Sequence, residues 1–221
     1  MKRLSIQSNV EQIRKNLHDE IIVAATKYVG SDQIRTLYAA GIDTMGENRV
    51  QDLLKKQEEL TDLPIHWHFI GHLQTNKVKS MINRIECLHS LDRIKLAIEI
   101  QKERNKPLDC FIEIKLTDEP LKTGVLPSNL LDFIRSLEKY DIIKVIGLMG
   151  MAKADGSVDE IRANFGLLRH LQRQVESLNL SYAPCHYLSM GMSQDYPYAL
   201  EFHSTHLRLG SILFRSEEND V

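Results

Sequence analysis

Short apolar runs alternate along the chain with longer stretches in which apolar residues recur every three or four positions. The first pattern predicts buried strands and the second predicts amphipathic helices. Strands are expected at residues 21–26, 43–45 (a weak one), 65–70, 85–89, 110–116, 144–149, 186–190 and 207–214. Helices are expected between them, most clearly at 158–178, and one more near 10–17 precedes the first strand.

This strict alternation of strands and helices favours parallel pairing through right-handed crossovers. Eight such units predict an α/β fold in which the strands close into a single TIM-type (β/α)₈ barrel. An open, doubly wound sheet is the alternative. No linker-like segment or change of composition divides the chain, so one domain is expected across residues 1–221.

Composition narrows the class of protein. Hydrophobic residues make up 43% of the 221 residues and charged residues 26%, which is typical of a folded globular chain. The net charge of -2 gives no electrostatic reason to expect nucleic acid or an anionic membrane as a partner. The longest apolar run, Ile21–Ala25, is too short to span a bilayer. Three widely spaced cysteines without a signal peptide favour the cytoplasm.

In a barrel of this kind the chemistry lies at the carboxyl ends of the strands. Lys27 follows the first strand, where neighbouring apolar residues are expected to desolvate it partly and favour the neutral amine that forms a Schiff base. A lysine whose ammonium reaches into water is the alternative. Asn48 follows the second strand, and it either caps the next helix or contacts a ligand.

The histidines His66, His68 and His72 resemble a metal cluster, because residues i and i+2 of a strand face the same side. The strands further along the chain end in methionines rather than in hard metal ligands. We therefore expect His66 and His68 to pack and to form hydrogen bonds, and we expect no metal. A metallohydrolase would require stoichiometric zinc in the purified protein.

Two segments near the end of the chain could bind an anion. Ser193 leaves the seventh strand among small residues whose backbone N–H groups are exposed, and Asp195 follows in the next helical turn. The alternative for this segment is a plain turn with a serine cap. Arg208 lies in an apolar strand, where it is expected to meet either a ligand or a carboxylate. Gly210 and Ser211 follow it, and Gly210 allows a close backbone approach.

Seven ordered stretches together carry a family resemblance: AATK (24–27), GENRVQD (46–52), WHFIGHLQTNK (67–77), KTG (122–124), GLM (147–149), LSMGMS (188–193) and STHLRLG (204–210). They resemble the pyridoxal phosphate homeostasis family, whose single-domain barrel is related to the cofactor domain of bacterial alanine racemase. The resemblance extends over nearly the whole chain.

The resemblance implies a pyridoxal phosphate (PLP) site and assigns a role to each matching residue. Lys27 would form the internal aldimine, and Arg208 would face the pyridine nitrogen. Ser193, with the backbone of Gly210 and Ser211, would hold the phosphate, and Asn48 would lie beside the ring. Further candidates by the same matching are Ser189 and Thr205.

An unprotonated pyridine ring is a poor electron sink, and a guanidinium beside the nitrogen opposes its protonation. The resemblance therefore implies a PLP-binding protein of PLP homeostasis with little or no catalysis, whose recipients would be apo forms of PLP-dependent enzymes. The alternative is a PLP-dependent amino-acid racemase or lyase. A racemase also needs a second acid or base, which an additional β domain of the partner subunit supplies. We expect no such domain in this chain, and therefore favour a monomer that holds the cofactor.

Overall fold

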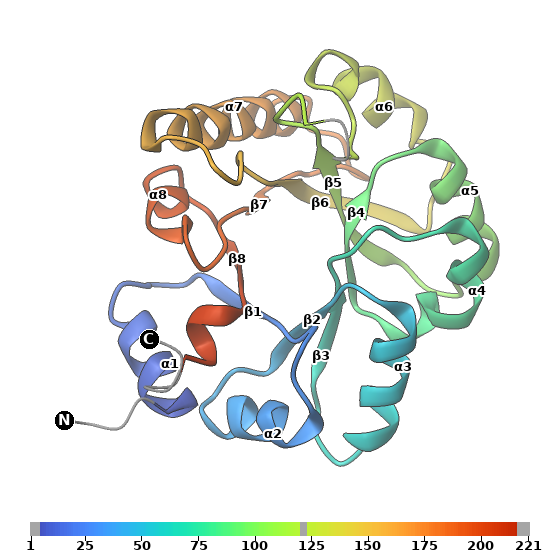
Figure 1. Cartoon of the computed structure of the whole chain (residues 1–221). Coiled ribbons are helices and arrows are strands. Elements are labelled where there is room, and N and C mark those ends of the chain that lie inside the picture. Colours follow the sequence, from blue (N-terminus) through green and yellow to red (C-terminus); the bar gives the residue numbers. More distant parts are fainter. Residues whose placement is uncertain (1–4, 120–122, 216–221) are drawn as a thin grey trace.

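The computed structural model describes residues 5–119 and 123–215. Eight parallel strands form a closed barrel in chain order, and β1 pairs with β8 to complete it. Helices surround this barrel on the outside (Figure 1). The strands are β1 (Ile21–Ala25), β2 (Thr44–Glu47), β3 (His66–Phe69), β4 (Cys87–Leu91), β5 (Leu108–Ile114), β6 (Ile143–Gly150), β7 (Tyr187–Ser189) and β8 (His206–Leu209). The predicted barrel is confirmed, and the open sheet is wrong.

The helices occupy the predicted intervals. They are α1 (Ile6–Arg14), α2 (Ser31–Ala39), α3 (Val50–Glu59), α4 (Val78–Met81), α5 (Ile94–Glu103), α6 (Leu130–Ser136), α7 (Val158–Glu176) and α8 (Tyr196–Glu201). Short 3₁₀ turns are η1 (Thr75–Lys77), η2 (Ile82–Arg84), η3 (Pro127–Asn129) and η4 (Ser211–Leu213). A capping box between Ser157 and Glu160 starts α7, which explains why the clearest predicted helix begins where it does.

Several predicted boundaries differ from the structure by one or two residues, and two differ by more, both near the contact between α1 and η4. The last strand stops at Leu209 rather than at residue 214, because the chain turns into η4 there. The first helix is α1 rather than residues 10–17, since Ser5 and Ser8 form a capping box that starts it earlier. Asn9 of α1 donates from Nδ2 to the Leu213 carbonyl over 3.1 Å, which ties the two elements together.

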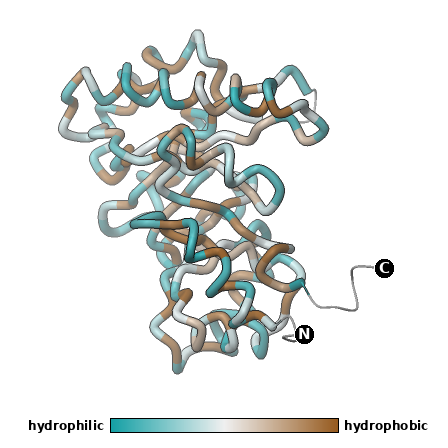
Figure 2. Tube along the Cα trace, turned by 90° about the vertical axis from the view of Figure 1, so that its left-hand side faces the viewer, coloured by the Kyte–Doolittle hydropathy of each residue, from teal (hydrophilic) through white to brown (hydrophobic). Residues whose placement is uncertain are grey.

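Two hydrophobic clusters fill the structure. The larger one lies between the strands and the surrounding helices. Hydrophobic and hydrophilic residues alternate along these helices, as expected for helices with one buried face (Figure 2). The smaller one consists of Cys87, Phe111, Ile146 and Met149, with Met151 packed against it. Because successive residues of a strand point to opposite faces, every second residue of each strand contributes to the barrel interior.

Two of the expectations from composition can be compared with the described residues. All three cysteines are buried and free. Within residues 5–119 and 123–215, no helix combines the length and the apolar character that a bilayer crossing requires.

Candidate functional site

A cavity of about 300 Å³ opens at the carboxyl end of the barrel. Its lining includes three of the predicted site residues, Lys27, Asn48 and Arg208. They come from the ends of β1, β2 and β8, which are neighbours in the closed sheet. The cavity is at the small end of the range of roughly 300–1,000 Å³ that small-molecule sites occupy.

Lys27 is more exposed than we expected. The strand β1 ends at Ala25 and Thr26 is buried, but the Lys27 side chain is exposed and lies at the edge of the cavity. Its Nζ atom lies 4.9 Å from the centre of the Tyr28 ring, and Tyr28 is itself 81% exposed. The expected partial desolvation of this amine is therefore wrong, and its reach to water matches the alternative.

The backbone that carries Lys27 is anchored by a buried ion pair. Lys56 of α3 donates from Nζ to Glu47 over 2.5 Å and to the Thr26 carbonyl over 2.6 Å. The Thr26 hydroxyl donates to the same Glu47 carboxylate over 2.6 Å. Lys56 and Glu47 are both buried, so this network fixes the ends of β1 and β2 against each other.

Asn48 does not cap the following helix. The N-cap of α3 is Arg49, and it makes no side-chain capping bond. The Oδ1 atom of Asn48 is buried without a hydrogen-bond partner among the described residues. A Cβ at Gly71 would lie 2.3 Å from the Asn48 carbonyl oxygen, so only glycine allows this close approach. An orphaned polar atom in a cavity wall is a group that a ligand can satisfy.

Arg208 is buried in β8 and bonds to neutral acceptors rather than to a carboxylate. Its Nη1 donates to the Ser189 carbonyl over 2.6 Å and to the Ser189 hydroxyl over 2.7 Å. Its Nη2 donates to the Gly150 carbonyl over 3.0 Å. Burial lowers the pKa of Arg208 to about 10, while the carboxylates of Asp195 and Glu113 oppose the change. The guanidinium therefore stays charged at neutral pH.

Glu113 is a titratable residue of the cavity wall that our sequence reasoning missed. It lies in β5 and is 4% exposed. Burial raises its pKa to about 7, and the Asp92 carboxylate adds to the rise while Arg208 opposes it. The sequence feature that identified Arg208 could have identified Glu113 as well, because both are charged residues within an apolar strand.

The predicted phosphate segment lies beside the cavity. The Ser193 hydroxyl accepts hydrogen bonds from the backbone N–H groups of Gly210, over 3.1 Å, and Ile212, over 3.3 Å. A Cβ at Gly210 would lie 3.5 Å from the Cβ of Ala25, which lines the cavity. Ser211 is exposed. Two amide donors thus converge on one oxygen next to the site.

Other residues that the sequence analysis named have structural roles or fall outside the described part. Asp195 precedes α8 as its N-cap residue and accepts from the Met192 N–H over 2.6 Å. The Thr205 hydroxyl is hydrogen-bonded to the Leu188 backbone and to His206. Lys122 of the KTG stretch lies outside the described residues.

A second cavity, of about 860 Å³, opens at the amino end of the barrel. Both His66 and His68 line it, as their spacing predicts. His66 is exposed and pairs with Glu86 over 2.7 Å, and the buried His68 bonds to His89 over 2.9 Å. The expectation that both histidines form hydrogen bonds is confirmed.

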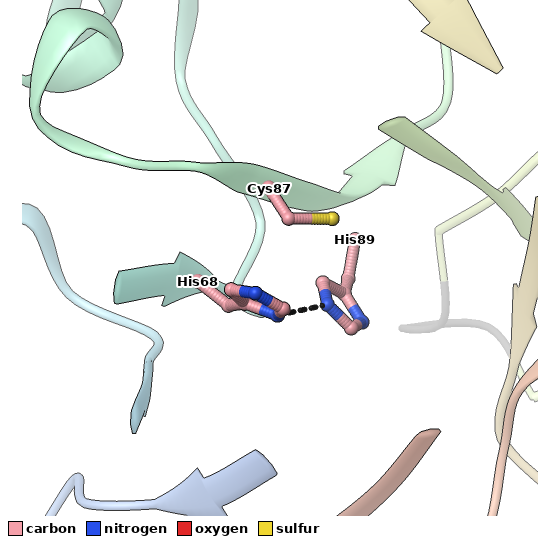
Figure 3. Close-up of side chains that lie close together, drawn as sticks. All are labelled: His68, Cys87 and His89. Carbon is pink, nitrogen blue, oxygen red and sulfur yellow. Dashed lines mark hydrogen bonds between the residues drawn. The ribbon is translucent and has the colours of Figure 1, made fainter. Parts of the chain in front are cut away.

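His72, the third histidine of the suspected metal cluster, lies at the other end of the barrel, where it lines the smaller cavity. A different trio, His68, Cys87 and His89, brings its ligand atoms within 4.8 Å of one another (Figure 3). The expected absence of a metal stays a prediction.

Comparison with known proteins identifies the family. The model of the alanine racemase N-terminal domain matches residues 2–218. The pyridoxal phosphate homeostasis protein of Aquifex aeolicus is 39% identical over 212 residues, which are 95% of this chain and 92% of that protein. The chain belongs to the pyridoxal phosphate homeostasis protein family. Its relative in Synechocystis sp. is 36% identical over 200 residues, 87% of this chain and 89% of that one.

Solved structures of the family share this barrel. PipY of Synechococcus elongatus, solved without PLP, superposes with a TM-score of 0.90 at 31% identity and covers 96% of this chain and 100% of its own. PipY with PLP bound gives a TM-score of 0.87 at 30% identity, over the same shares of both chains. Alanine racemase from Corynebacterium glutamicum has a TM-score of 0.77 at 13% identity over 98% of this chain and 62% of its own, which shows the fold alone.

Proposed function

We propose that this protein binds PLP at the carboxyl end of its barrel and serves PLP homeostasis, with little or no catalysis of its own. The observation that carries the proposal is the convergence of Lys27, Asn48 and Arg208 on one cavity. Relatives of similar length are named PLP homeostasis proteins, and PipY has been solved with PLP bound. Lys27 supplies the amine, Arg208 a fixed positive charge and Asn48 an unsatisfied polar atom.

When bound, PLP supplies an aldehyde that condenses with a primary amine and releases water. Lys27 is the residue that we assign to this attachment, because it is at the edge of the cavity and is exposed. Its exposure suits a cofactor that must be taken up and given away. The ion pair of Glu47 and Lys56 holds the backbone of the preceding residue in place.

Arg208 favours holding the cofactor over activating it. A guanidinium directed at a pyridine nitrogen opposes protonation of that nitrogen and so weakens the ring as an electron sink. Arg208 is charged at neutral pH and buried, so its field is little screened by water. A guanidinium at that position favours a cofactor carrier over a transaminase, which places a carboxylate there.

The phosphate group fits the segment around Ser193. The backbone N–H groups of Gly210 and Ile212 converge on the Ser193 hydroxyl, and a phosphate oxygen could accept from the same donors. Ser211, which is exposed, lies between them in the sequence. The neighbouring Gly191 has a φ of 92°, which places the turn after β7 in a conformation that glycine adopts easily.

A PLP-dependent racemase or lyase is the second candidate, and one observation favours it. Glu113 lies in the same cavity as Lys27, and its pKa of about 7 suits proton transfer near neutral pH. A racemase needs two such groups. Exchange of the α-proton of an amino acid with deuterium, faster than with free PLP and lost in Glu113→Gln, would establish this second function.

The test of the proposed function is chemical trapping. The protein is incubated with PLP and reduced with borohydride, and the modified peptide is identified by mass spectrometry. We expect one adduct, on Lys27, together with a visible absorption band that reduction removes. Lys27→Ala should lose both, whereas the control Lys55→Ala, a lysine on α3 with a 75% exposed side chain, should keep both. A wild-type spectrum that ignores PLP, or an adduct on another lysine, would contradict the assignment.

Delivery to other enzymes follows from the same property and stays a prediction. Apo forms of PLP-dependent enzymes are the expected recipients, and a monomer in the cytoplasm is the expected form. Size-exclusion chromatography with light scattering tests the monomer. Recovery of activity by an apo-enzyme that is mixed with the loaded protein, measured beside an equal concentration of free PLP, tests the delivery.

A further inference from the structure

A continuous hydrogen-bond chain crosses the interior of the barrel between its two cavities. Nδ1 of His68 is 2.9 Å from Nε2 of His89. Nδ1 of His89 is 2.8 Å from the hydroxyl of Ser189, which lies 2.7 Å from Nη1 of Arg208. His68 lines the amino-end cavity and Arg208 the carboxyl-end cavity, so the chain joins the two.

The donors and acceptors of this chain follow from Arg208. A guanidinium only donates, so the Ser189 oxygen accepts from it. The Ser189 hydroxyl proton has no other acceptor among the described residues, and His89 Nδ1 is therefore its acceptor. If the Ser189 hydroxyl instead accepted a hydrogen bond from His89, its own proton would be buried without an acceptor. That would cost free energy, so this arrangement is unfavourable.

The proton positions on both imidazole rings follow from the Ser189 hydrogen bond. Burial, together with His68, His206 and Arg208, lowers the pKa of His89 well below its usual range, so its ring is neutral. A neutral ring that accepts at Nδ1 carries its proton on Nε2, and His89 therefore donates to Nδ1 of His68. Burial lowers the pKa of His68 to about 3, so this ring is also neutral with its proton on Nε2.

Every member of the chain is buried. His89 and Ser189 are 0% exposed, Arg208 is 5% exposed and His68 is 8% exposed. Such a network holds its members in place only when each polar group is satisfied. Both ring nitrogens of His89 are engaged within the chain, so hydrogen bonding alone accounts for the His68 and His89 pair in Figure 3 without a metal.

We propose that Ser189 and His89 are positioning residues that hold the Arg208 guanidinium toward the cofactor, with His89 acting through the hydroxyl of Ser189. The inference rests on the proposed function, because it assigns Arg208 to the pyridine ring. Ser189 binds Nη1 through two oxygens, and His89 keeps the hydroxyl turned so that its lone pairs face Arg208. Without that orientation, one N–H of the guanidinium loses its acceptor, and only the carbonyls of Ser189 and Gly150 still hold the group.

Two substitutions of His89 separate this role from mere packing. In His89→Asn the amide oxygen takes roughly the place of Nδ1 and can still accept from Ser189. In His89→Gln the amide reaches the place of Nε2, so the bond to Ser189 is lost. We expect His89→Gln and Ser189→Ala to bind PLP about tenfold more weakly, which corresponds to the loss of one hydrogen bond to a charged group. We expect their visible band to shift, and we expect His89→Asn to retain the wild-type band and affinity.

A measurement on the protein without cofactor keeps the inference testable even if a variant fails to fold. Nitrogen-15 NMR of the imidazole rings reads which ring nitrogen carries the proton. We expect His68 and His89 both to carry it on Nε2 at neutral pH. Cys87→Ala serves as the control variant, because Cys87 lies beside the two rings but outside the chain, and it should leave the rings and the spectrum unchanged.

Several results would overturn the inference. A proton on Nδ1 of His89, or His89→Gln and Ser189→Ala variants that bind PLP with the wild-type spectrum and affinity, would remove the positioning role. Stoichiometric zinc that is lost in Cys87→Ala would replace the hydrogen-bond chain with a metal site. A wild-type protein that binds no PLP defeats the proposed function instead, while the NMR result still decides the proton order.

Discussion

The two ends of the barrel hold cavities of unequal size, and the smaller one is the candidate site. The amino-end cavity measures about 860 Å³ and the carboxyl-end cavity about 300 Å³. Size therefore does not identify the site. The smaller cavity collects a lysine, an arginine and an orphaned amide oxygen, whereas the buried histidines that line the larger one are neutral.

Charge separates the two ends as clearly. The amino-end cavity is lined by five carboxylates, which belong to Asp19, Glu20, Asp43, Glu86 and Asp109. Arg14 and the histidines around them do not balance these charges fully. A phosphate ester would be repelled there, whereas at the other end it meets Lys27 and Arg208. The comparison teaches that convergent donors and charge, rather than volume, mark the end that binds.

The largest effect on stability is expected at the carboxyl end, where Glu47 and Lys56 form the buried ion pair. Glu47→Gln leaves the Lys56 ammonium buried without its charged partner and should lower the free energy of unfolding by about 3–5 kcal/mol. The double variant Glu47→Leu with Lys56→Met should recover most of this loss. Urea unfolding measures both. A single variant that loses less than about 1 kcal/mol would show that water reaches Lys56.

Acid should destabilise the amino end. Burial, with the nearby Arg208 charge, lowers the pKa of His206 to about 4, whereas the unfolded chain has a value near 6.5. The unfolded state therefore binds a proton first, and stability falls as the pH drops from about 6.5 to 4, by on the order of 3 kcal/mol for this residue. His206→Phe should reduce that slope, measured by urea unfolding at several pH values. An unchanged slope would place the acid sensitivity elsewhere.

The carboxyl end should respond to pH in the opposite sense. Burial raises the pKa of Glu113 to about 7 from its ordinary value of 4.5. The folded state therefore holds this proton longer, and stability falls as the pH rises from about 4.5 to 7, by on the order of 2–3 kcal/mol. Glu113→Gln should remove this loss and be more stable than the wild type at pH 8. A variant that is less stable at pH 8 would show that the ionised carboxylate is paired.

Much of this architecture could be predicted from the sequence, because strand and helix patterns are local. The rule that chemistry lies after the strands then brought Lys27, Asn48 and Arg208 to one end of the barrel, and the structure places all three around one cavity. The end of the last strand could not be predicted in this way. The apolar residues of η4 continue the pattern of β8 although the backbone turns after Leu209.

The contacts that adjust the site depend on the register of the barrel, and a single sequence does not reveal them. His89 and Ser189 are 100 residues apart in the sequence. They meet only because both side chains, one from β4 and one from β7, point into the barrel interior. Lys56 lies at an apolar position of the α3 pattern, but the sequence pattern does not show that its ammonium group reaches Glu47. The exposure of Lys27 was also missed, and β1 ends at Ala25, one residue earlier than we expected.

The smallest effect on stability is expected for Lys27→Ala, the variant that should abolish the attachment of PLP. Lys27→Ala removes an exposed side chain whose contact with the Tyr28 ring is worth about 0.5–1 kcal/mol at most, so the free energy of unfolding should change by less than that. Urea unfolding of the wild type, Lys27→Ala and Lys55→Ala, each without cofactor, measures this directly. The same variant should lose the trapped adduct entirely. If Lys27→Ala instead lost 2 kcal/mol or more, the lysine would belong to the fold, and the missing adduct could no longer be attributed to the missing amine.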